Sequence, residues 1–384
     1  MNRPDEWGDA LEGLKARGLY RRLRETAPLG GMKAAVDGAC CVLFSTNNYL
    51  GLADHPETVA SAVRALQAYG AGAQASRLVS GNFPIHRELE AATASFKGEE
   101  ACLAFPSGYM ANLAAVAALA GEGDAVLCDR LNHASLVDAC RASGARLRVF
   151  RHRDVADLDR VLARCGPHPR KLVVTDAMFS MDGDLADLPG VMETAARHGA
   201  RVLVDDAHGT GVLGAGGRGI AHHFKTPNRP DAVVGTYSKA LGSVGGFVAG
   251  PQPLMEMLVN KARTFIYTTG LPPSACGASL GALAVLNREP GRVDRLWNLS
   301  RRLRASLSGA GYELVPGEGP ILPVLVGDNE KCLAFSRQLL DKGYFVPAIR
   351  PPTVPKGTAR LRISVSSSHT DEEVDGLAKA FASL

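Results

Sequence analysis

Two apolar runs that end in polar side chains organise this sequence: Val202-Leu203-Val204-Asp205-Asp206-Ala207-His208-Gly209 and Ala232-Val233-Val234-Gly235-Thr236-Tyr237-Ser238-Lys239. Short runs of Val, Leu and Ala of this kind are typical of strands buried on both faces of a parallel sheet. Ligands bind in open α/β sheets beyond the carboxyl ends of the strands. The pattern therefore predicts that Asp205 and Lys239 lie at the ligand-binding edge of such a sheet.

The same alternation of short apolar runs and helical patterns extends from about residue 55 to residue 250. Strands are expected at 101–104, 125–128, 146–150, 171–175, 201–205, 231–236 and 246–249. Helices are expected at 56–69, 86–96, 109–120, 134–143, 155–164 and 189–199. Strand–helix alternation of this length predicts a three-layer α/β/α domain around a mostly parallel sheet.

The pattern changes after about residue 275. Expected helices at 275–287, 291–309 and 330–342, and a last one after Ser368-His369-Thr370-Asp371, alternate with expected strands near 312–315, 321–326, 344–349 and 360–365. This order predicts a small α+β domain. At the other end, residues 1–30 carry the leucine stripe of one amphipathic helix. We therefore expect an N-terminal helix with short strands over 1–50, a large domain over 51–274 and a small C-terminal domain over 275–384.

Composition excludes several classes of protein. Hydrophobic residues make up 46% and charged residues 21% of the 384 residues, as in a soluble globular protein. The net charge of +4 is too small to indicate nucleic-acid binding, which needs a clustered basic face. The 8 cysteines include no Cys-x-x-Cys pair, so a zinc site is not expected. A disulfide framework is not expected either in a chain of this length without a secretory signal. A polar N-terminus and a longest apolar stretch of only Leu113 to Ala120 predict a cytoplasmic protein with no membrane span.

An acid, hydroxyl groups and a lysine at one sheet edge form the set of side chains that pyridoxal 5'-phosphate (PLP) requires. The Asp205 carboxylate can accept a charge-assisted hydrogen bond from the protonated pyridine nitrogen. Lys239 stands among small and hydroxyl residues rather than other charges, which favours burial. Burial lowers the pKa of a lysine toward the neutral amine that attacks an aldehyde. Asp206 would point to the opposite side of its strand, so we expect a structural role for it.

Further segments that follow predicted strands add candidate ligands. Ser107-Gly108-Tyr109 would lie at a helix N-terminus, where free N–H groups bind phosphate, although an ordinary helix cap has the same pattern. His133 could stack on a flat heteroaromatic ring or make a plain polar contact. Asp176 or Ser180 could contact a ring hydroxyl. Arg350 precedes two prolines, which suits bidentate capture of a carboxylate and equally a solvated surface arginine.

Longer motifs resemble the α-oxoamine synthases, a family of PLP enzymes of fold type I, over nearly the whole chain. The segments that carry the resemblance are Ser45 to Leu52, Ser76 to Gly81, Met178 to Asp184, Asp205 to Gly211, Thr236 to Gly246 and Tyr267 to Pro273. The run from Arg350 to Arg362 is similar to the branch of the family that acts in biotin biosynthesis. The resemblance implies the PLP-dependent transferase fold type I, with a large α/β domain and a small C-terminal domain.

The resemblance also implies roles for individual residues toward the cofactor. Lys239 would form the Schiff base with PLP and shuttle a proton, Asp205 would pair with the pyridine nitrogen, and His133 would stack on the ring. His208 and Ser180 would contact the ring hydroxyl region. The implied phosphate ligands are Gly108, Tyr109 and Thr236, helped by Thr268 or Thr269 from the partner subunit of a homodimer.

On the substrate side, the resemblance implies that Arg350 binds the carboxylate of an amino acid and that Asn47 and Arg21 line the acyl side. The expected reaction is an acyl transfer that joins L-alanine to a pimeloyl thioester with loss of carbon dioxide. The thioester would be pimeloyl-CoA or pimeloyl-acyl carrier protein. A basic N-terminal segment that includes Arg22 and Arg24 could meet an acidic carrier, or it could be a solvated helix face.

Other readings stay open beside this one. Glycine C-acetyltransferase and 5-aminolevulinate synthase share the family pattern but use glycine and a shorter acyl-CoA. A generic aminotransferase shares the fold, and a non-catalytic PLP-binding protein would be expected to lack the lysine. Two positions depart from the family pattern: Asp176 stands where a longer Glu is expected, and Gln74 lies among alanines where glycines are common.

Overall fold

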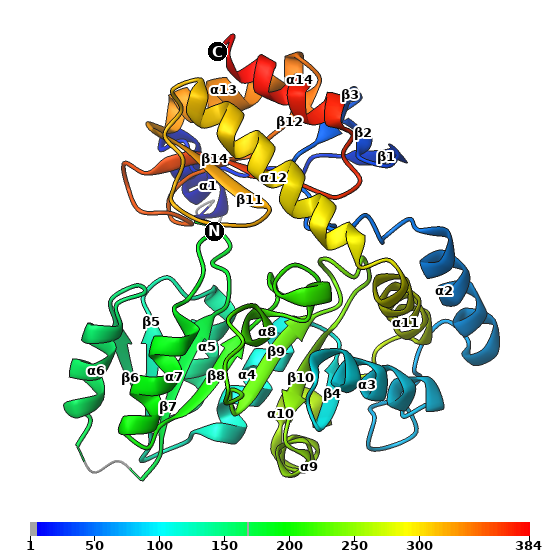
Figure 1. The fold of residues 1–384 in the computed structure, drawn as a ribbon, viewed down its shortest axis with the longest axis vertical. Helices are drawn as coiled ribbons and strands as arrows, with labels where there is room; N and C mark the ends of the chain where they lie inside the picture. Colours follow the sequence, from blue (N-terminus) through cyan, green and yellow to red (C-terminus); the bar gives the residue numbers. More distant parts are fainter. Residues whose placement is uncertain (1–5, 167–168) are drawn as a thin grey trace, which may run out of the picture. The chain divides into compact units, whose positions relative to one another are not determined.

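The computed structural model describes residues 6–166 and 169–384 and divides the chain into two compact units (Figure 1). The larger unit comprises residues 47–180 and 184–296, and the smaller unit comprises residues 1–46, 181–183 and 297–384. The units divide the chain at 46 and 296 rather than at the expected 50 and 274. The reason is that α11 (Pro273–Arg288) packs along α2 (Pro56–Tyr69) and α3 (Pro84–Lys97), which places it in the larger unit.

The larger unit is built on a sheet of seven strands in the order β4-β10-β9-β8-β7-β5-β6. The strands are β4 (Ala101–Phe105), β5 (Ala125–Asp129), β6 (Arg146–Phe150), β7 (Lys171–Asp176), β8 (Arg201–Asp205), β9 (Ala232–Thr236) and β10 (Gly246–Gly250). Only β10 runs antiparallel to its neighbours. The predicted strands and the mostly parallel sheet are therefore confirmed.

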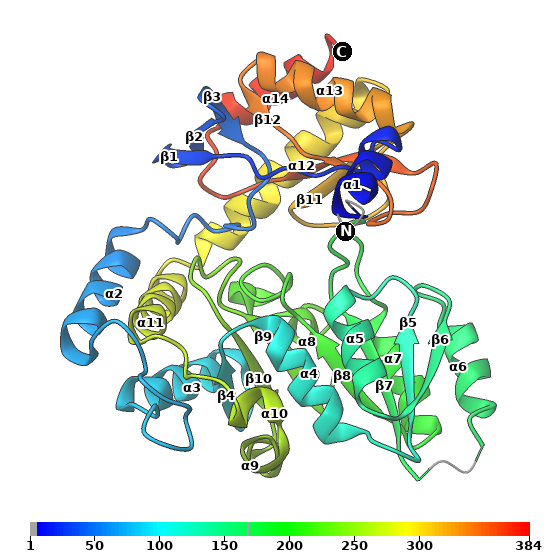
Figure 2. The same cartoon turned by 180° about the vertical axis from the view of Figure 1, so that it is seen from behind.

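Helices cover both faces of this sheet, as a parallel sheet requires. Besides α2, α3 and α11, they are α4 (Gly108–Leu119), α5 (Ala134–Ala142), α6 (Val155–Ala163), α7 (Leu188–Arg197), α8 (Ile220–His223), α9 (Gln252–Lys261) and α10 (Arg263–Ile266), with a 3₁₀ turn η1 (Ala215–Gly217). Figures 1 and 2, seen from opposite sides, show α7 on one face and α4 and α5 on the other.

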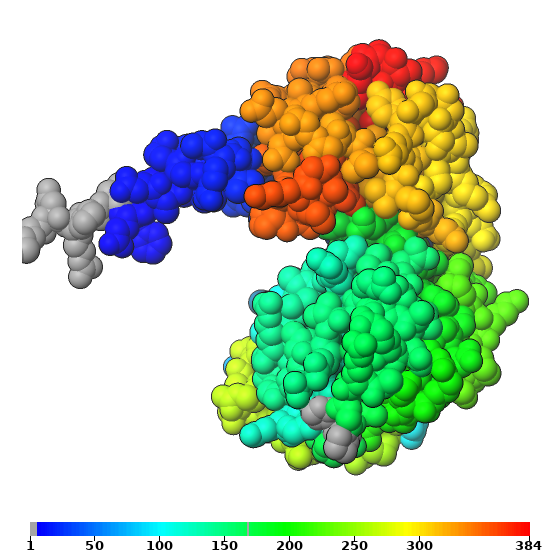
Figure 3. Space-filling view, turned by 90° about the vertical axis from the view of Figure 1, so that its left-hand side faces the viewer, coloured from blue at the N-terminus to red at the C-terminus, as the bar shows by residue number. Residues whose placement is uncertain are grey.

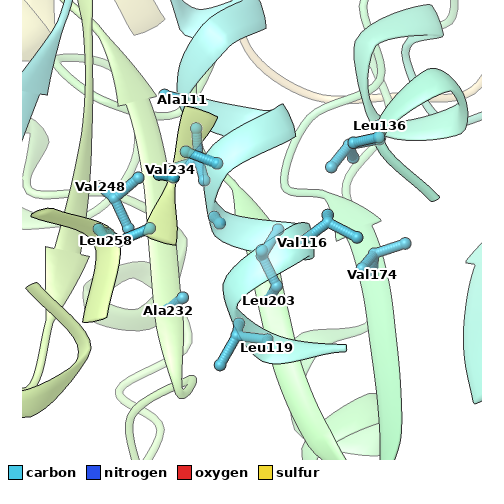
Figure 4. Close-up of a cluster of buried hydrophobic side chains, with 14 of the residues drawn as sticks. Ala111, Val116, Leu119, Leu136, Val174, Leu203, Ala232, Val234, Val248 and Leu258 are labelled. Carbon is cyan, nitrogen blue, oxygen red and sulfur yellow. The ribbon is translucent and has the colours of Figure 1, made fainter. Parts of the chain in front are cut away.

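Helix α4 is the centre of the core of the larger unit. Its Ala111, Val116 and Leu119 pack on Leu203 of β8 and Val234 of β9, and all of these are buried (Figure 4). Because α4 is apolar nearly all round, it is enclosed between the sheet and the helices α5, α9 and α10. This packing holds the N-terminus of α4 beside the carboxyl ends of the central strands.

The smaller unit combines segments from the N-terminal and C-terminal parts of the chain. One sheet has the order β1-β2-β3-β12, from β1 (Thr26–Gly30), β2 (Lys33–Val36), β3 (Ala39–Leu43) and β12 (Tyr344–Phe345). A second has the order β11-β14-β13, from β11 (Ile321–Gly327), β14 (Ala359–Ser364) and β13 (Ala348–Ile349). The helices are α1 (Glu6–Ala16), α13 (Asn329–Asp341) and α14 (Asp371–Phe381), while α12 (Gly291–Gly309) begins in the larger unit.

The N-terminal segment differs from the expected single helix over 1–30, and that prediction is wrong. Helix α1 ends at Ala16, Gly18 adopts a left-handed φ of 62°, and the chain then forms the hairpin of β1 and β2. None of the residues of α1 is buried, and Figure 3 shows this blue segment standing on the surface. Within the described residues, the leucine stripe is therefore not buried against a core as the amphipathic pattern predicts.

Within the described ranges, no helix combines the length and the apolar character that a membrane crossing needs.

Candidate active site

Asp205 is the last residue of β8 and is 5% exposed. Its Oδ2 accepts a hydrogen bond from Nδ2 of Asn112 at 2.7 Å, and its Oδ1 accepts one from the N–H of Ala207 at 2.9 Å. These two donors leave the carboxylate in one orientation at the end of the strand. A buried acid held in this way can accept a further hydrogen bond from a cationic N–H group.

A second acid and two bases lie around Asp205. Asp176 ends the neighbouring strand β7, in register with Asp205, and accepts the backbone N–H of His133 at 2.6 Å. Burial, together with the negative charge of Asp205, raises the pKa of Asp176 well above its usual value, while the positive charge of Lys239 opposes this rise. Burial lowers the pKa of His133, which also feels the charges of Asp205 and Lys239. The structure therefore brings Lys239, Asp205 and His133 into one electrostatic cluster.

Lys239 lies in the turn between β9 and β10. Its side chain is half-buried, whereas the small and hydroxyl residues around it predicted burial. The turn is closed by hydrogen bonds from the N–H of Gly242 to the carbonyl of Lys239 and from the N–H of Tyr237 to the carbonyl of Gly245. Gly242 has a φ of 62°, and a Cβ there would lie 2.3 Å from the backbone nitrogen of Ala53. A glycine is therefore required to bring the turn this close to the preceding loop.

The predicted phosphate ligands form a cradle at the start of α4. Ser107 caps the helix by accepting the N–H of Met110, and Gly108 is the first helical residue. A Cβ on Gly108 would lie 2.4 Å from Cγ2 of Thr236, so only glycine lets strand β9 approach the helix end. Oγ1 of Thr236 is buried and has no hydrogen-bond partner in the described part of the chain. An unpaired buried hydroxyl beside a helix N-terminus fits a bound phosphate, which accepts hydrogen bonds from both.

Tyr109 follows in α4 and is 43% exposed, and its hydroxyl donates to a carboxylate oxygen of Asp138. This hydrogen bond raises the pKa of Tyr109. The backbone N–H of Tyr109 belongs to the first turn of α4, whose N–H groups have no partner within the helix itself.

His208 is buried beyond the end of β8, and its Nδ1 lies 2.8 Å from the hydroxyl of Tyr49. The same hydroxyl donates to Oδ1 of Asn47 at 3.2 Å. Tyr49 thus links a residue predicted to face the cofactor to one predicted to face the acyl substrate. The sequence interpretation missed Tyr49, although a tyrosine beside a predicted site residue was available as a signal.

Ser180 and Thr268 are the remaining predicted cofactor ligands. Ser180 is half-buried and follows Phe179 in the hairpin closed by the bridge between Met178 and Leu185. Thr268 lies in the turn after α10, next to the bridge that pairs Thr269 with Ser76. Its role toward a partner subunit stays a prediction.

Arg21 and Arg350 belong to the smaller unit and lie side by side there. They line a cavity of about 200 Å³ together with Leu19, Pro351 and Thr353. Nη2 of Arg21 donates to Oγ1 of Thr353 at 3.0 Å, and Nη1 of Arg350 donates to the carbonyl of Gly18. Each guanidinium keeps further N–H groups beyond these contacts, because arginine carries five of them.

Two further residues singled out in the sequence, Asp206 and Gln74, have structural explanations. Asp206 forms a buried ion pair with Lys97 at 2.5 Å, which confirms its structural role. Gln74, where a glycine is common in the family, adopts a φ of 66°, so the backbone keeps the left-handed conformation that glycine favours. Asn112 was missed as a site residue, although it is the one amide in the otherwise apolar run of α4.

Comparison with known proteins adds a family to this geometry. Residues 40–381 match the family described as aminotransferase class I and II. A relative named 8-amino-7-oxononanoate synthase from Symbiobacterium thermophilum is 45% identical over 98% of this chain and 96% of its own length. The protein of that name from Geobacter sulfurreducens is 45% identical over 97% and 96%, respectively.

Among solved structures, the serine palmitoyltransferase of Sphingomonas wittichii is similar with a TM-score of 0.94 and 35% identity, covering 99% of this chain and 96% of its own. The 8-amino-7-oxononanoate synthase of Francisella tularensis is similar with a TM-score of 0.78 and 26% identity, covering 89% of this chain and 97% of its own.

Proposed function

We propose that this chain, which belongs to the aminotransferase class I and II family, is a PLP-dependent acyltransferase of biotin biosynthesis. It joins L-alanine to a pimeloyl thioester and releases 8-amino-7-oxononanoate, carbon dioxide and the free thiol. The observation that carries this proposal is the 45–48% identity to relatives named for that product over at least 97% of the chain.

The residues of the larger unit fit PLP. The unpaired hydroxyl of Thr236 and the helix start at Gly108 suit its phosphate, and the oriented carboxylate of Asp205 suits its pyridine nitrogen. When bound, PLP supplies an electron sink for the negative charge that develops on the α-carbon of the amino acid. Lys239 would hold the cofactor through its amine and would serve as the base that takes the α-proton of alanine.

The other residues orient and protect this chemistry. Asn112 and the N–H of Ala207 hold the carboxylate of Asp205, which would accept a hydrogen bond from the pyridine nitrogen and favour its protonated form. His133 would stack on the cofactor ring, and burial lowers the pKa of His133, which favours the neutral imidazole. His208 and Ser180 would contact the ring hydroxyl region of PLP. Asp176, which is shorter than the glutamate common in the family, accepts a hydrogen bond from the N–H of His133.

The substrate contacts are proposed from the resemblance alone. Arg350 binds the carboxylate of alanine, and Arg21 and Asn47 contact the acyl chain. A homodimer supplies Thr268 from the partner subunit, and the protein works in the cytoplasm. The thioester is carried by coenzyme A or by acyl carrier protein.

An assay with matched substrate pairs tests the proposal. Purified protein loaded with PLP is given L-alanine with pimeloyl-CoA, glycine with acetyl-CoA or succinyl-CoA, and L-serine with palmitoyl-CoA. Thiol release and carbon dioxide are measured for each pair. We expect the first pair to react fastest by a wide margin, and a higher rate with any other pair would overturn the assignment. Exchange of amino groups with a keto acid, without carbon dioxide release, would instead indicate an aminotransferase.

A further inference from the structure

His152 is bonded at both ring nitrogens to buried carboxylates of the larger unit. Its Nδ1 lies 2.9 Å from Oδ1 of Asp129, and its Nε2 lies 2.9 Å from Oδ2 of Asp184. The two aspartates are 2% and 6% exposed. The imidazole also packs against the ring of Phe179 in a T-shaped arrangement, with ring centroids 4.4 Å apart and an interplanar angle of 89°. These contacts set the ring between three segments of the chain that are distant in sequence.

Asp129 organises the turn that leads to His133. Its Oδ1 accepts the N–H of Leu131 at 2.8 Å, and its Oδ2 accepts the N–H of Arg153 at 2.9 Å. The backbone N–H of Asn132 donates to the carbonyl of Asp129 at 3.2 Å, which closes the turn. The position of His133 at the start of α5 therefore depends on how this carboxylate is held.

Asp184 organises the hairpin that carries Ser180. The N–H of Phe179 donates to the carbonyl of Asp184 at 3.0 Å, and the N–H of Ala186 donates to the carbonyl of Ala177 at 3.0 Å. Nη1 of Arg153 adds a contact of 3.2 Å to Oδ2 of Asp184. The side chain of Asp184 is thus the point at which the base of this hairpin is attached to His152.

We propose that His152 is a positioning residue for the cofactor site, whose doubly bonded ring holds the turn that carries His133 and the hairpin that carries Ser180 in fixed register. The inference rests on the proposed function, because only there do His133 and Ser180 face PLP. His152 would act through the two carboxylates that it bonds, Asp129 and Asp184.

The double contact requires an imidazolium, since a neutral ring has only one N–H to donate. Burial alone would lower the pKa of His152, but the hydrogen bonds to Asp129 and Asp184 outweigh it and raise the pKa to about 9. The charged groups bonded to this cluster are Asp129, Asp184 and Arg153. The arrangement is therefore complete at neutral pH and is lost as the pH rises through about 9.

PLP binding across pH tests the proposal without relying on turnover. The dissociation constant of PLP is measured by its visible absorbance for the wild type and His152→Gln, near pH 7 and near pH 10. We expect the variant to bind about tenfold more weakly at the lower pH, the worth of one hydrogen bond to a charged group. The ratio of the dissociation constant of the variant to that of the wild type should fall toward one at the higher pH, where the imidazole of His152 is neutral in the wild type.

Control and rescue variants separate this role from a general structural effect. His198→Gln breaks a histidine–aspartate contact of the same length, 2.9 Å, to a more exposed aspartate, Asp159, and should leave PLP affinity unchanged. Asp184→Asn keeps the shape of the side chain but removes a charge that raises the pKa of His152. PLP affinity should therefore decline at a lower pH in this variant than in the wild type. This variant also serves if His152→Gln does not fold.

Two outcomes would overturn the proposal. The first is a variant and a wild type that bind PLP with nearly equal dissociation constants at neutral pH. The second is a ratio of these constants that is the same at both pH values, as a purely structural histidine would give. A wild-type protein that binds no PLP at either pH would refute the proposed function itself, and this inference would fall with it.

Discussion

Asn112 donates a hydrogen bond from Nδ2 to Oδ2 of Asp205, 2.7 Å away, and thereby ties α4 to the end of β8. The same helix begins at Gly108, beside the unpaired hydroxyl of Thr236. One rigid element thus positions both the acid for the pyridine nitrogen and the cradle for the phosphate. The cofactor would be held at two ends by a single helix.

Replacing Asn112 should therefore impair catalysis through Asp205. Asn112→Ala removes one of the two hydrogen-bond donors that orient this carboxylate, so the acid can rotate away from the pyridine nitrogen. We expect kcat/KM for the alanine reaction to fall about tenfold to hundredfold. Asn260→Ala removes an exposed amide of α9 that donates to the carbonyl of Glu256 at 2.8 Å, and it should leave kcat/KM unchanged. Equal losses in both variants would contradict the orienting role.

Lys239→Ala should abolish turnover and the covalent attachment of PLP. Borohydride reduction followed by peptide mass analysis should find the reduced adduct on Lys239 of the wild type and no adduct in the variant. The phosphate cradle and Asp205 are intact in the variant, so it should still bind PLP non-covalently. Lys261→Ala, at the exposed end of α9, is the control and should keep the adduct. An adduct on another lysine would remove Lys239 from this role.

Thr236→Val should separate cofactor binding from folding. Valine has the same shape as threonine but no hydroxyl, and the hydroxyl has no partner in the described structure to lose. The apoprotein should unfold at the same temperature or slightly higher, because an unsatisfied buried polar group is removed. PLP affinity should fall about tenfold. Thr194→Val in α7, also buried, should not alter PLP affinity, measured by the same absorbance titration.

Arg350→Ala should raise the KM for alanine about 10- to 100-fold, the expected cost of losing a charge-assisted carboxylate contact. Arg350→Lys should recover only part of this loss, because an ammonium cannot form the bidentate contact. Arg337→Ala, exposed on α13, is the control. Steady-state kinetics with varied alanine measure the effect, and an unchanged KM would place the carboxylate elsewhere.

Acid should destabilise the smaller unit through His369. Its ring stacks on Phe44 with centroids 4.0 Å apart, accepts the N–H of Ser366 at 2.9 Å and lies 3.0 Å from the carbonyl of Leu43. Burial lowers the pKa of His369 from 6.5 to about 4. Only the neutral ring can accept from Ser366, so protonation opposes folding.

The unfolded state therefore gains its proton first as the pH falls. Stability is present above the unfolded pKa of 6.5 and is lost progressively down to about 4. This residue should account for about 3 kcal/mol of that loss. Urea unfolding of the wild type and His369→Gln across this range measures it: the variant should be less stable near neutrality and should show a shallower pH dependence. Parallel curves would show that another group is responsible.

Local patterns were sufficient to predict the central sheet. Strands β7, β8 and β9 were expected within a residue or two because each is a short apolar run enclosed on both faces. The positions of Asp205 and Lys239 follow from the same pattern, since parallel strands put their carboxyl ends at one edge. The leucine stripe of residues 1–30 misled, because a helical period says nothing about whether a partner surface exists.

The sequence by itself determined which residue types stand at the ends of strands and at the start of α4, because strand and helix periodicity and cap chemistry act over a few neighbouring residues. Only the tertiary structure decided that Asn112 reaches Asp205, that Tyr49 reaches His208, and that His152 lies between two aspartates. These pairs are separated by 93, 159 and up to 32 positions. Such contacts depend on how whole helices and strands pack, and no local pattern of side chains specifies that packing.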